Sequence, residues 1–556
     1  MIKYIFVRHV CLMILMAFTT LHGVTLTDII QEHIRTTIEN AGAPPQIVIS
    51  DDLLYSTVVL PAFYERRGYW PAWIDENGLL PQVQTLVQTL RNASQEGLTP
   101  TDYHLTCIDN LLQKIGTVQK KSLFEHTALL ADIDLVLTDA YLVYASHLLA
   151  GRVNPVTIHA EWNVKQREVD FIELLENALR QNQIRESLQA LVPRHNDYAR
   201  LRAALTYYRA IAKKIDAIQL PSGVTLKRDD EGKNISALRK RLILEGDLIV
   251  EGGQNDSIFN SEIETALKNF QKRYGLEATG VIDSATLEAW NIPIAHRIRQ
   301  LEINLERWRW LPQEFTSHYM IVNIANFELY AIENDSIALS ARVIVGRTYR
   351  RTPVFSDSIS YLVLNPYWHV PRNIAVQDIL PQIKKNTGYL SKNKMTLFKG
   401  SGSNAEIVDP RAVNWAAVNA QNFSFTLRQD PGEANALGRV KFMFPNKYNV
   451  YIHDTPSKEL FEKSERGFSS GCIRVEKALE LAGYLLKDSQ QWSQNKINAA
   501  IKKGTEQTVR LKKTIPIHLL YWTAWVGRDG MVNFRKDIYE RDVLLDQALR
   551  EAPPDK

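Results

Sequence analysis

The chain has 556 residues, of which 45% are hydrophobic and 23% are charged. This composition is typical of a globular protein and excludes a largely disordered chain or a bundle of membrane helices. The formal net charge is +4, and no basic block of the kind that follows nucleic-acid phosphates is present, so we expect no nucleic-acid partner. The length predicts about three or four domains.

The first 23 residues are expected to direct export rather than to join the fold. Lys3 and Arg8 precede an apolar run over residues 10–21, which is too short to span a bilayer comfortably. We interpret residues 1–23 as a secretory signal peptide. An uncleaved membrane anchor is the alternative, because the small-residue cleavage pattern is poor. No later segment is long and apolar enough to cross a membrane.

Three cysteines are present, and Cys11 lies in the expected signal segment. Secreted proteins that depend on disulfides usually contain more than the remaining two, Cys107 and Cys472. These two could pair, but nothing in the sequence requires it. An unpaired thiol in an oxidising compartment would need a function of its own.

Residues 28–225 are expected to form a helical scaffold domain, because apolar residues recur there at three- and four-residue spacing. This region also contains an aromatic cluster that would serve either as a sugar-binding platform or, in the interpretation we favour, as helix-packing core. The cluster consists of Tyr64, Tyr69, Trp70 and Trp73.

A compact unit of three short helices is expected within residues 230–295. The second helix is predicted to begin at Ser261, with Glu264 placed as in a capping box, and to end at Gly275. Asp283 is expected to cap the third helix. These features predict a small capped bundle, which could be purely structural.

From about His318 the pattern changes to short β-rich runs bounded by turn residues, which predicts a mainly β domain over residues 316–495. A polar insertion at 371–423 is expected to act as a lid, and 496–556 to be a C-terminal extension. The expected fold class of the whole chain is therefore α+β multidomain. The expected strands cover residues 319–324, 342–346, 360–364, 441–444 and 449–452.

One stretch of this β region contains the residues that a cysteine nucleophile needs. Such a thiol requires a base or a positive neighbour, and its acyl transition state requires amide donors. His453 follows a strand and could reach Cys472, and Arg474 could hold a substrate carboxylate. Gly471 would leave its own amide and that of Cys472 free to face a substrate.

Two further features bear on this hypothesis. A helix expected over 476–486 would place its N-terminus near the thiol and favour an anion there. His369 competes with His453 as the base. From the residues alone, a cysteine beside a glycine is more often structural than catalytic.

The segment from His453 to Arg474 resembles the signature of the L,D-transpeptidase family, in which a histidine precedes a Ser/Thr-His-Gly-Cys core and an arginine follows the cysteine by two residues. Here the core reads Ser-Ser-Gly-Cys, so Ser470 stands where many members have histidine. The large periplasmic branch shows this form, and the resemblance extends from Phe63 to Tyr539. Residues 266–286 resemble the small peptidoglycan-binding domain of many wall enzymes.

The resemblance implies a periplasmic or cell-envelope acyltransferase that forms 3–3 cross-links between peptidoglycan stem peptides. It needs no metal or organic cofactor. Its partners would be a donor and an acceptor stem, and other wall-synthesis enzymes are candidate associates. Cys472 would be the nucleophile, His453 the base, and Gly471 with Cys472 the oxyanion donors. The implied substrate-binding residues are Arg474, Tyr451, Ser470 and Trp368, with the 371–423 insertion as substrate cap.

Alternative functions share the same residues. Water could take the thioester, which would make the enzyme an L,D-carboxypeptidase, or the acceptor could be an outer-membrane lipoprotein. A non-catalytic wall-binding scaffold would be expected to lack the cysteine or the histidine, and both are present. We expect a main-chain carbonyl, rather than the Asp454 side chain, to orient His453.

Overall fold

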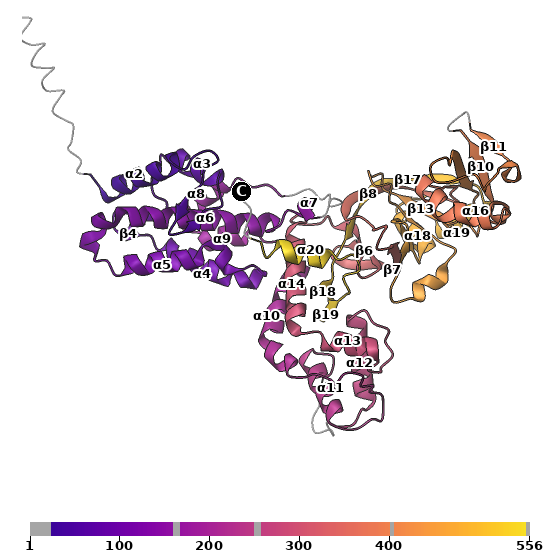
Figure 1. Cartoon of the computed structure of the whole chain (residues 1–556), viewed down its shortest axis with the longest axis horizontal. Coiled ribbons are helices and arrows are strands. Elements are labelled where there is room, and N and C mark those ends of the chain that lie inside the picture. Colours follow the sequence, from indigo (N-terminus) through magenta and orange to yellow (C-terminus); the bar gives the residue numbers. More distant parts are fainter. Residues whose placement is uncertain (1–23, 159–166, 250–256, 401–404, 552–556) are drawn as a thin grey trace, which may run out of the picture. The chain divides into compact units, whose positions relative to one another are not determined.

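The computed structural model describes residues 24–158, 167–249, 257–400 and 405–551. The expected signal segment, residues 1–23, lies outside them. The chain divides into two compact units (Figure 1). Within the described ranges, no helix combines the length and the apolar composition needed to cross a bilayer. The described residues of the first unit lie within 24–152, 168–192 and 551, and those of the second lie within 153–158, 167 and 193–550.

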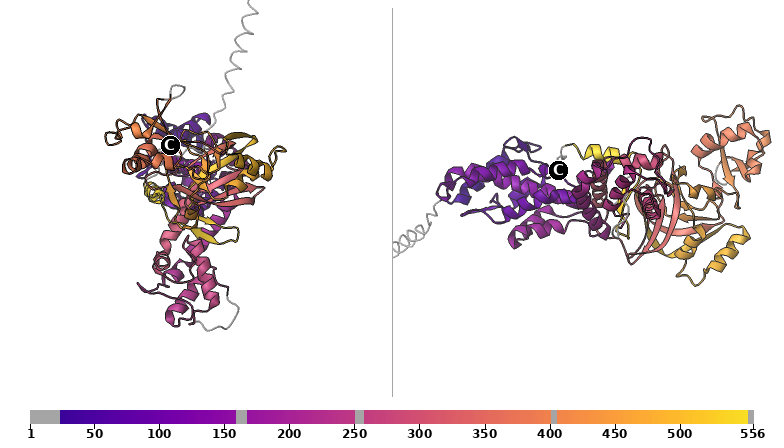
Figure 2. Two further views of the ribbon diagram at one scale, coloured as in Figure 1. Left: turned by 90° about the vertical axis from the view of Figure 1, so that its right-hand side faces the viewer. Right: turned by 90° about the horizontal axis from the view of Figure 1, so that it is seen from below.

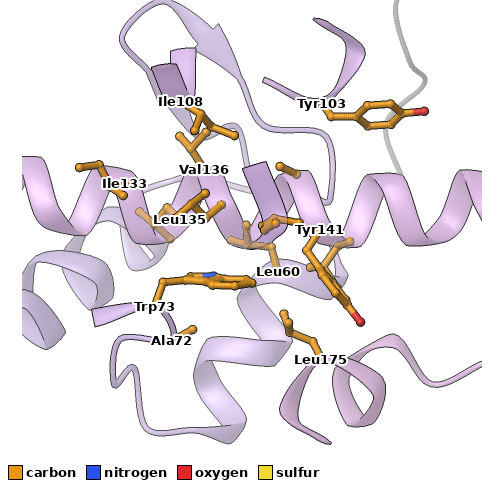
Figure 3. Close-up of a cluster of buried hydrophobic side chains, with 14 of the residues drawn as sticks. Leu60, Ala72, Trp73, Tyr103, Ile108, Ile133, Leu135, Val136, Tyr141 and Leu175 are labelled. Carbon is orange, nitrogen blue, oxygen red and sulfur yellow. The ribbon is translucent and has the colours of Figure 1, made fainter. Parts of the chain in front are cut away.

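The first unit is helical and is built around one central helix, α6 (Thr127–Ala150). Helix α6 is buried on nearly every side because apolar residues occupy its whole circumference rather than one stripe. Its Leu135 and Tyr141 lie in a buried cluster with Leu60 and Trp73 (Figure 3). The surrounding elements are α2 (Leu26–Glu39), β1 (Val48–Ile49), β2 (Asp52–Leu53), α3 (Val59–Arg66), β3 (Ile74–Asp75), β4 (Gly78–Leu79), α4 (Gln82–Arg91), η1 (Asn92–Glu96), η2 (Pro100–Tyr103), α5 (Leu105–Gly116), η3 (Lys120–His126), α8 (Phe171–Gln181) and α9 (Ile184–Gln189).

The aromatic cluster of the first unit belongs mainly to its core. Tyr64 and Trp73 are fully buried. The Tyr64 hydroxyl donates to the Asp134 carboxylate at 2.7 Å, and Trp73 Nε1 donates to the Thr138 hydroxyl at 3.0 Å. Trp70 is 42% exposed. The core interpretation is confirmed for Tyr64 and Trp73.

The second unit begins its helical part with α10 (Asn196–Asp216), which packs along α14 (Ile294–Arg309). Arg209 of α10 forms an ion pair with Glu302 of α14 at 2.6 Å. The predicted scaffold domain, residues 28–225, therefore extends over both units, because its last long helix packs within the second unit. A short helix, α7 (Pro155–Ile158), also belongs to this unit.

The three expected short helices are present as α11 (Lys233–Leu244), α12 (Ser261–Arg273) and α13 (Ser284–Asn291). The Asp283 side chain accepts from the Thr286 amide at 2.8 Å, so the predicted cap of α13 is confirmed. The predicted start of α12 at Ser261 is confirmed, but its N-cap is Asn260 and not Ser261 as a capping box would require. Asn260 has the extended backbone of an N-cap, and its side chain accepts from the Ile263 amide at 3.0 Å.

A nine-stranded sheet follows, in the order β15-β7-β16-β14-β13-β8-β17-β5-β6. Strand β7 pairs with β6 over its first half and with β16 near its end, so the sheet closes into a barrel. The strands are β5 (His318–Asn323), β6 (Glu328–Glu333), β7 (Ser336–Gly346), β8 (Phe355–Leu364), β13 (Val440–Met443), β14 (Ile452–His453), β15 (Gly467–Ser469), β16 (Ile473–Val475) and β17 (Gln507–Leu520).

Two expectations about the barrel are wrong. Strand β17 lies between β8 and β5, so the β domain does not end at 495 and residues 496–556 are not merely an extension. Strand β14 begins at Ile452 rather than 449, because Asn449 has φ +53° and cannot continue an extended strand. The remaining elements of this region are η7 (Lys458–Glu462), α18 (Ala478–Leu485), α19 (Gln494–Lys503), β18 (Ala524–Val526), β19 (Val532–Phe534) and α20 (Arg541–Ala548).

The insertion forms a lobe with its own sheet and core, coloured orange in Figure 2. Its sheet has the order β11-β10-β12-β9, and Ile383, Leu397 and Leu427 are buried in its core. The predicted limits, 371–423, are too narrow because β9 and β12 flank them. Residues 401–404 of its expected turn lie outside the described chain. Its elements are β9 (Trp368–His369), α15 (Arg372–Ile374), η4 (Ala375–Ile379), α16 (Leu380–Lys385), α17 (Tyr389–Lys392), β10 (Met395–Lys399), β11 (Glu406–Val408), η6 (Pro410–Ala412) and β12 (Phe425–Gln429).

Candidate active site

Three adjacent strands of the barrel place three basic side chains in one row. Lys441 of β13 lies opposite His453 of β14, and His453 lies opposite Arg474 of β16. Residues that lie opposite each other on neighbouring strands face the same side of a sheet. Tyr451 and Cys472 precede β14 and β16 directly, and these two strands are parallel. The register therefore gathers all five residues at one end of the barrel wall.

The thiol of Cys472 is half-buried and not in a disulfide. It donates a long hydrogen bond, 3.8 Å, to the Asn449 carbonyl. Burial raises the pKa of the thiol, while the amide and phenol of Tyr451, then Lys441 and Arg474, act in the opposite direction. The resting nucleophile is therefore a thiol rather than a thiolate at neutral pH, and it needs a base. Cys107, the other free cysteine of the described residues, is buried in the first unit.

His453 is buried, and its orientation is set by the main chain. Its Nδ1 donates to the Asp454 carbonyl at 2.5 Å, which leaves Nε2 as the basic nitrogen. The expectation that a main-chain carbonyl orients His453 is confirmed. The Asp454 carboxylate instead accepts from the Arg439 amide at 2.9 Å and pairs with Lys458 at 2.5 Å.

Burial, together with the charge of Arg474, lowers the pKa of His453 to about 3. The imidazole is therefore neutral near pH 7, and its Nε2 carries no proton in the resting site. Among the described residues, His453 forms no hydrogen bond with Cys472. Catalytic hydrogen bonds are often long before the substrate binds.

The loop before Cys472 depends on a glycine. Gly471 has φ +112°, a conformation that L side chains rarely adopt. Its amide donates to the Ser469 hydroxyl at 3.1 Å, and this hydroxyl donates to the Cys472 carbonyl at 2.5 Å. The expectation that the Gly471 amide is free as an oxyanion donor is therefore wrong. Within the described chain the Cys472 amide has no acceptor, and it remains the candidate donor.

Residues distant in sequence hold this loop in place. The Thr352 hydroxyl donates to the Gly471 carbonyl at 2.9 Å and accepts from the Gly346 amide at 2.9 Å. The Tyr539 hydroxyl donates to the Gly346 carbonyl at 2.5 Å. Tyr539 therefore supports the nucleophile loop from the end of the chain.

Ser470 connects the nucleophile loop to the insertion. Arg350 donates to the Ser470 hydroxyl at 2.7 Å and forms an ion pair with Asp378 of η4 at 2.5 Å. A second nitrogen of Arg350 donates to the Gln377 side chain at 2.5 Å. Ser470, expected to bind substrate, is thus held by an arginine that also contacts the insertion.

Arg474 carries an uncompensated charge beside the thiol. Its guanidinium is mostly buried, forms no ion pair among the described residues, and its Nε lacks a hydrogen-bond partner there. Burial, together with the like charge of Arg347, lowers the pKa of Arg474. A buried cation without a partner is costly unless an anion binds to it. Arg474 is therefore suited to hold a carboxylate near Cys472.

Other residues expected at the site lie elsewhere. Trp368 packs half-buried against the core of the insertion, and neither it nor the exposed His369 contacts Cys472 in the described structure. Helix α18 begins only at Ala478, after strand β16. The three residues of β16 carry the chain about 10 Å onward, so the expected helix N-terminus is not adjacent to the thiol.

Lys441 was not expected from the sequence. Its Nζ lies 3.9 Å from the centroid of the Tyr451 ring, and the described residues offer it no ion pair. Burial lowers the pKa of Lys441, while the charge of Cys472 acts in the opposite direction. The alternation of β13 puts Lys441 on the face opposite to Phe442, and only the pairing with His453 reveals its place.

The described residues show no group of three or more His, Cys, Asp or Glu side chains arranged to hold a metal ion. The chemistry that this arrangement supports is acyl transfer through a thioester. A neutral imidazole can deprotonate the thiol, an amide can stabilise an oxyanion, and a free guanidinium can position an anionic donor.

Comparison with known proteins places each part in a family. Residues 317–509 match the L,D-transpeptidase catalytic domain. Residues 59–205 match a scaffold domain, and 231–289 match a family described as "Putative peptidoglycan binding domain". The chain therefore contains an L,D-transpeptidase catalytic domain and is an enzyme. It is an α+β multidomain protein that adds a scaffold domain and a peptidoglycan-binding domain to this catalytic barrel.

A curated protein of Haemophilus influenzae, named "Putative L,D-transpeptidase", is 33% identical over 250 residues. The match covers 45% of this chain and 49% of the relative, so the chain spans about half the length of the curated relative that it matches. Because the match covers only about half of the relative, the activity of the whole protein is a proposal and is given below as one.

Two solved structures are also similar to parts of the chain. One is the L,D-transpeptidase (residues 123-326) from Xylanimonas cellulosilytica, which is 13% identical, with 54% of this chain and 100% of that chain covered and a TM-score of 0.18. The other is the Ldtfm-avibactam carbamoyl enzyme, which is 9% identical, with 58% and 98% covered and a TM-score of 0.17. At these scores neither superposition adds to the argument.

Proposed function

We propose that the enzyme forms 3–3 cross-links between peptidoglycan stem peptides through a thioester on Cys472. The observation that carries this proposal is the site at the barrel wall. A protonated thiol, a neutral His453 with its Nε2 free, and an unpaired Arg474 lie together there. The matches to the catalytic and peptidoglycan-binding families support the same substrate class.

In the first step, Nε2 of His453 removes the proton of the Cys472 thiol, and the sulfur attacks the carbonyl carbon of the third stem residue in a tetrapeptide donor. The Cys472 amide stabilises the oxyanion. The tetrahedral intermediate then expels the amine of the terminal D-Ala, which takes its proton from His453. A thioester remains, and free D-Ala leaves.

In the second step, the side-chain amine of an acceptor stem loses a proton to His453 and attacks the thioester carbonyl. The carbon–sulfur bond breaks, the thiolate regains a proton from His453, and a new amide joins the two stems. No oxidant, metal or nucleotide is consumed. Lys441 and the Tyr451 phenol stabilise the thiolate whenever it forms, because both lower the pKa of Cys472.

Arg474 selects the donor. A stem whose third residue is a diaminopimelate carries a free carboxylate close to the reacting carbonyl, and the unpaired guanidinium of Arg474 would receive it. The insertion lobe, held to the nucleophile loop through Arg350, would cover the bound donor. We place the enzyme in the periplasm or cell envelope, where this substrate is found.

The same acyl-enzyme would serve two other acceptors. Water would make the enzyme an L,D-carboxypeptidase, and an outer-membrane lipoprotein would make it an attachment enzyme. We favour the stem amine because the segment at 231–289 adds a peptidoglycan-binding family to the catalytic domain. A β-lactam of the carbapenem class, which is itself an acyl donor, would acylate Cys472.

The test is mass spectrometry of purified enzyme incubated with disaccharide-tetrapeptide muropeptides. The proposal expects dimers whose tandem spectra show a 3–3 linkage, together with release of free D-Ala. Tripeptide products without dimers would identify a carboxypeptidase. Unchanged tetrapeptides, with enzyme shown to be folded, would contradict the proposal.

A further inference from the structure

Two cavities of the second unit meet at one β-hairpin, and neither is lined by a residue of the candidate active site. The first, about 690 Å³, lies between the start of α10, strands β5 and β6, and the β18–β19 hairpin. The second, about 670 Å³, lies between α12 and the same hairpin. Tyr330, Trp525, Gly527 and Arg528 line both cavities. We refer to these two cavities, which share four lining residues, as the groove.

Aromatic side chains line the groove. Trp308 and Trp522 are buried and stack on each other with ring centroids 4.5 Å apart. Tyr319, Tyr330 and Trp525 are half-buried, so that part of each ring remains accessible. A cavity of this size with aromatic walls and a few polar groups is the usual form of a binding site for small molecules or chain segments.

Charges along the first cavity are balanced. It is lined by three basic and three acidic side chains besides His195, and Arg194 pairs with Glu314 at 3.4 Å. Arg200 likewise pairs with Asp197. A polyanion such as a nucleic acid would need a basic excess here. The lining instead suits a chain that is polar but nearly neutral.

The groove is built from segments fixed to one another. The guanidinium of Arg535 lies 4.8 Å from the centre of the Trp525 ring and donates to the Arg273 carbonyl at 2.7 Å. Arg273, at the end of α12, donates to the Val532 carbonyl of β19 at 2.6 Å. Trp525 is therefore oriented by contacts that also attach the peptidoglycan-binding segment to the hairpin.

We propose that this groove binds a linear amino-sugar polymer, namely the glycan strand that carries the stem peptides. The apolar faces of its sugar rings would lie on Trp525, Tyr319 and Tyr330, and its hydroxyl and acetamido groups would bond to the polar side chains along the walls. The aromatic lining, the balanced charge of the first cavity and the residues of α12 that line the second cavity carry the proposal. The identity of the polymer as peptidoglycan rests on the proposed function.

The test uses the full chain and a β-1,4-linked tetramer of N-acetylglucosamine as the probe, with affinity measured by ligand-observed NMR. Trp525→Ala should weaken binding roughly tenfold or more, as expected for loss of a central aromatic anchor. Arg528→Ala changes an exposed residue that lines both cavities and should weaken binding measurably without a risk to folding. Phe124→Ala is the control, because Phe124 is an exposed aromatic residue of the first unit.

The proposal is supported if the wild-type chain and Phe124→Ala bind the tetramer and both Trp525→Ala and Arg528→Ala lose this binding. No binding by the wild-type chain, or unchanged binding by the folded variants, overturns it. Displacement of the tetramer by a single-stranded oligonucleotide also overturns it. If Trp525→Ala does not fold, Arg528→Ala decides. The assay needs no stem peptide and no turnover, so its result is independent of whether cross-linking is observed.

Discussion

The ammonium group of Lys441 lies against the ring of Tyr451, 3.9 Å from its centroid, on the side of the barrel wall that carries Cys472. Both residues lower the pKa of the thiol, against the effect of burial. The burial of Lys441 without an ion pair in the described structure suggests that its charge is used when the thiolate forms.

Replacement of Lys441 by methionine keeps the length of the side chain and removes its charge. We expect acylation of Cys472 at pH 7 to slow by roughly tenfold, which corresponds to an increase of about one unit in the thiol pKa. The readout is the pH profile of thiol alkylation by iodoacetamide, whose midpoint should move upward in Lys441→Met.

Lys447→Met is the matched control, because Lys447 is exposed and lies over Tyr448, 5.1 Å from its ring centroid. Its profile should coincide with that of the wild type. An unchanged midpoint in Lys441→Met would show that the lysine has no part in thiolate stabilisation.

The low pKa of His453 predicts an unusual pH profile. Because its folded pKa is about 3, the base stays unprotonated as the pH falls from 7 to about 4, and acylation should show no acidic limb from His453 in this window. His453→Ala should acylate far more slowly at pH 7 and should recover part of its rate only at alkaline pH, since the thiol pKa is raised.

The matched variant is His369→Ala. His369 is exposed on β9 and is the base that the sequence left as an alternative. Its rate should remain close to that of the wild type. If His369→Ala were not acylated while His453→Ala reacted at the normal rate, His369 and not His453 would be the base.

Arg350 should couple the insertion to the nucleophile loop. Arg350→Ala removes the contacts to Ser470 and Asp378 together, so we expect KM for the donor to rise and kcat to fall, because both the lobe and the loop lose a partner. Arg411→Ala, an exposed arginine of the same lobe paired with Asp409, should change neither. Hydrogen exchange of η4 would show whether the lobe has loosened, and equal exchange in both variants would contradict the coupling.

The sequence predicted which chemical groups form the site, but it did not predict all of the strand pairings and loop contacts that position them. Cys472, His453 and Arg474 lie within 22 residues of one another, and their types and order already indicate a thiol, a base and an anion site. Lys441 could not be recognised, because its role depends on which strand pairs with β14. The Gly471 amide was misassigned because the bond to Ser469 depends on a loop conformation that composition does not show.

For the fold, the sequence likewise predicted local elements correctly and missed features that depend on long-range contacts. Local signals such as the Asp283 cap and the β-rich runs at 319–324 and 360–364 were sufficient to predict α13, β5 and the second half of β8. Strand β17 was missed because its place between β8 and β5 is a long-range pairing. The long helix α10 was predicted as part of the scaffold domain, and only its long-range packing on α14 shows that it lies in the second unit.

A buried histidine of the first unit predicts how stability depends on pH. Burial alone would lower the pKa of His104, but hydrogen bonds to Asp139 at 2.7 Å and Asp52 at 3.0 Å raise it to about 9. Because the folded pKa is raised, the contribution to stability is complete below pH 6.5 and is lost as the pH rises through about 9.

Urea unfolding of the wild type should therefore show a decrease of about 3 kcal/mol in the free energy of unfolding between pH 6 and pH 9.5. His104→Gln should be less stable at pH 6 and should lack most of this dependence. His33→Gln, a half-buried histidine of the same unit, should retain it. If the free energy of unfolding of the wild type does not change between pH 6 and pH 9.5, the proposed effect of the Asp139 and Asp52 hydrogen bonds on His104 is wrong.

Intact-protein mass spectrometry tests whether Cys472 forms the acyl-enzyme, with a tetrapeptide donor whose side-chain amine is acetylated so that the donor cannot also serve as acceptor. The wild type and Cys107→Ala should gain a mass equal to the donor less one D-Ala, and peptide digestion should map this adduct to Cys472. Cys472→Ala should show no adduct. An adduct of the same mass on folded Cys472→Ala protein, or on Cys107 of the wild type, would contradict it.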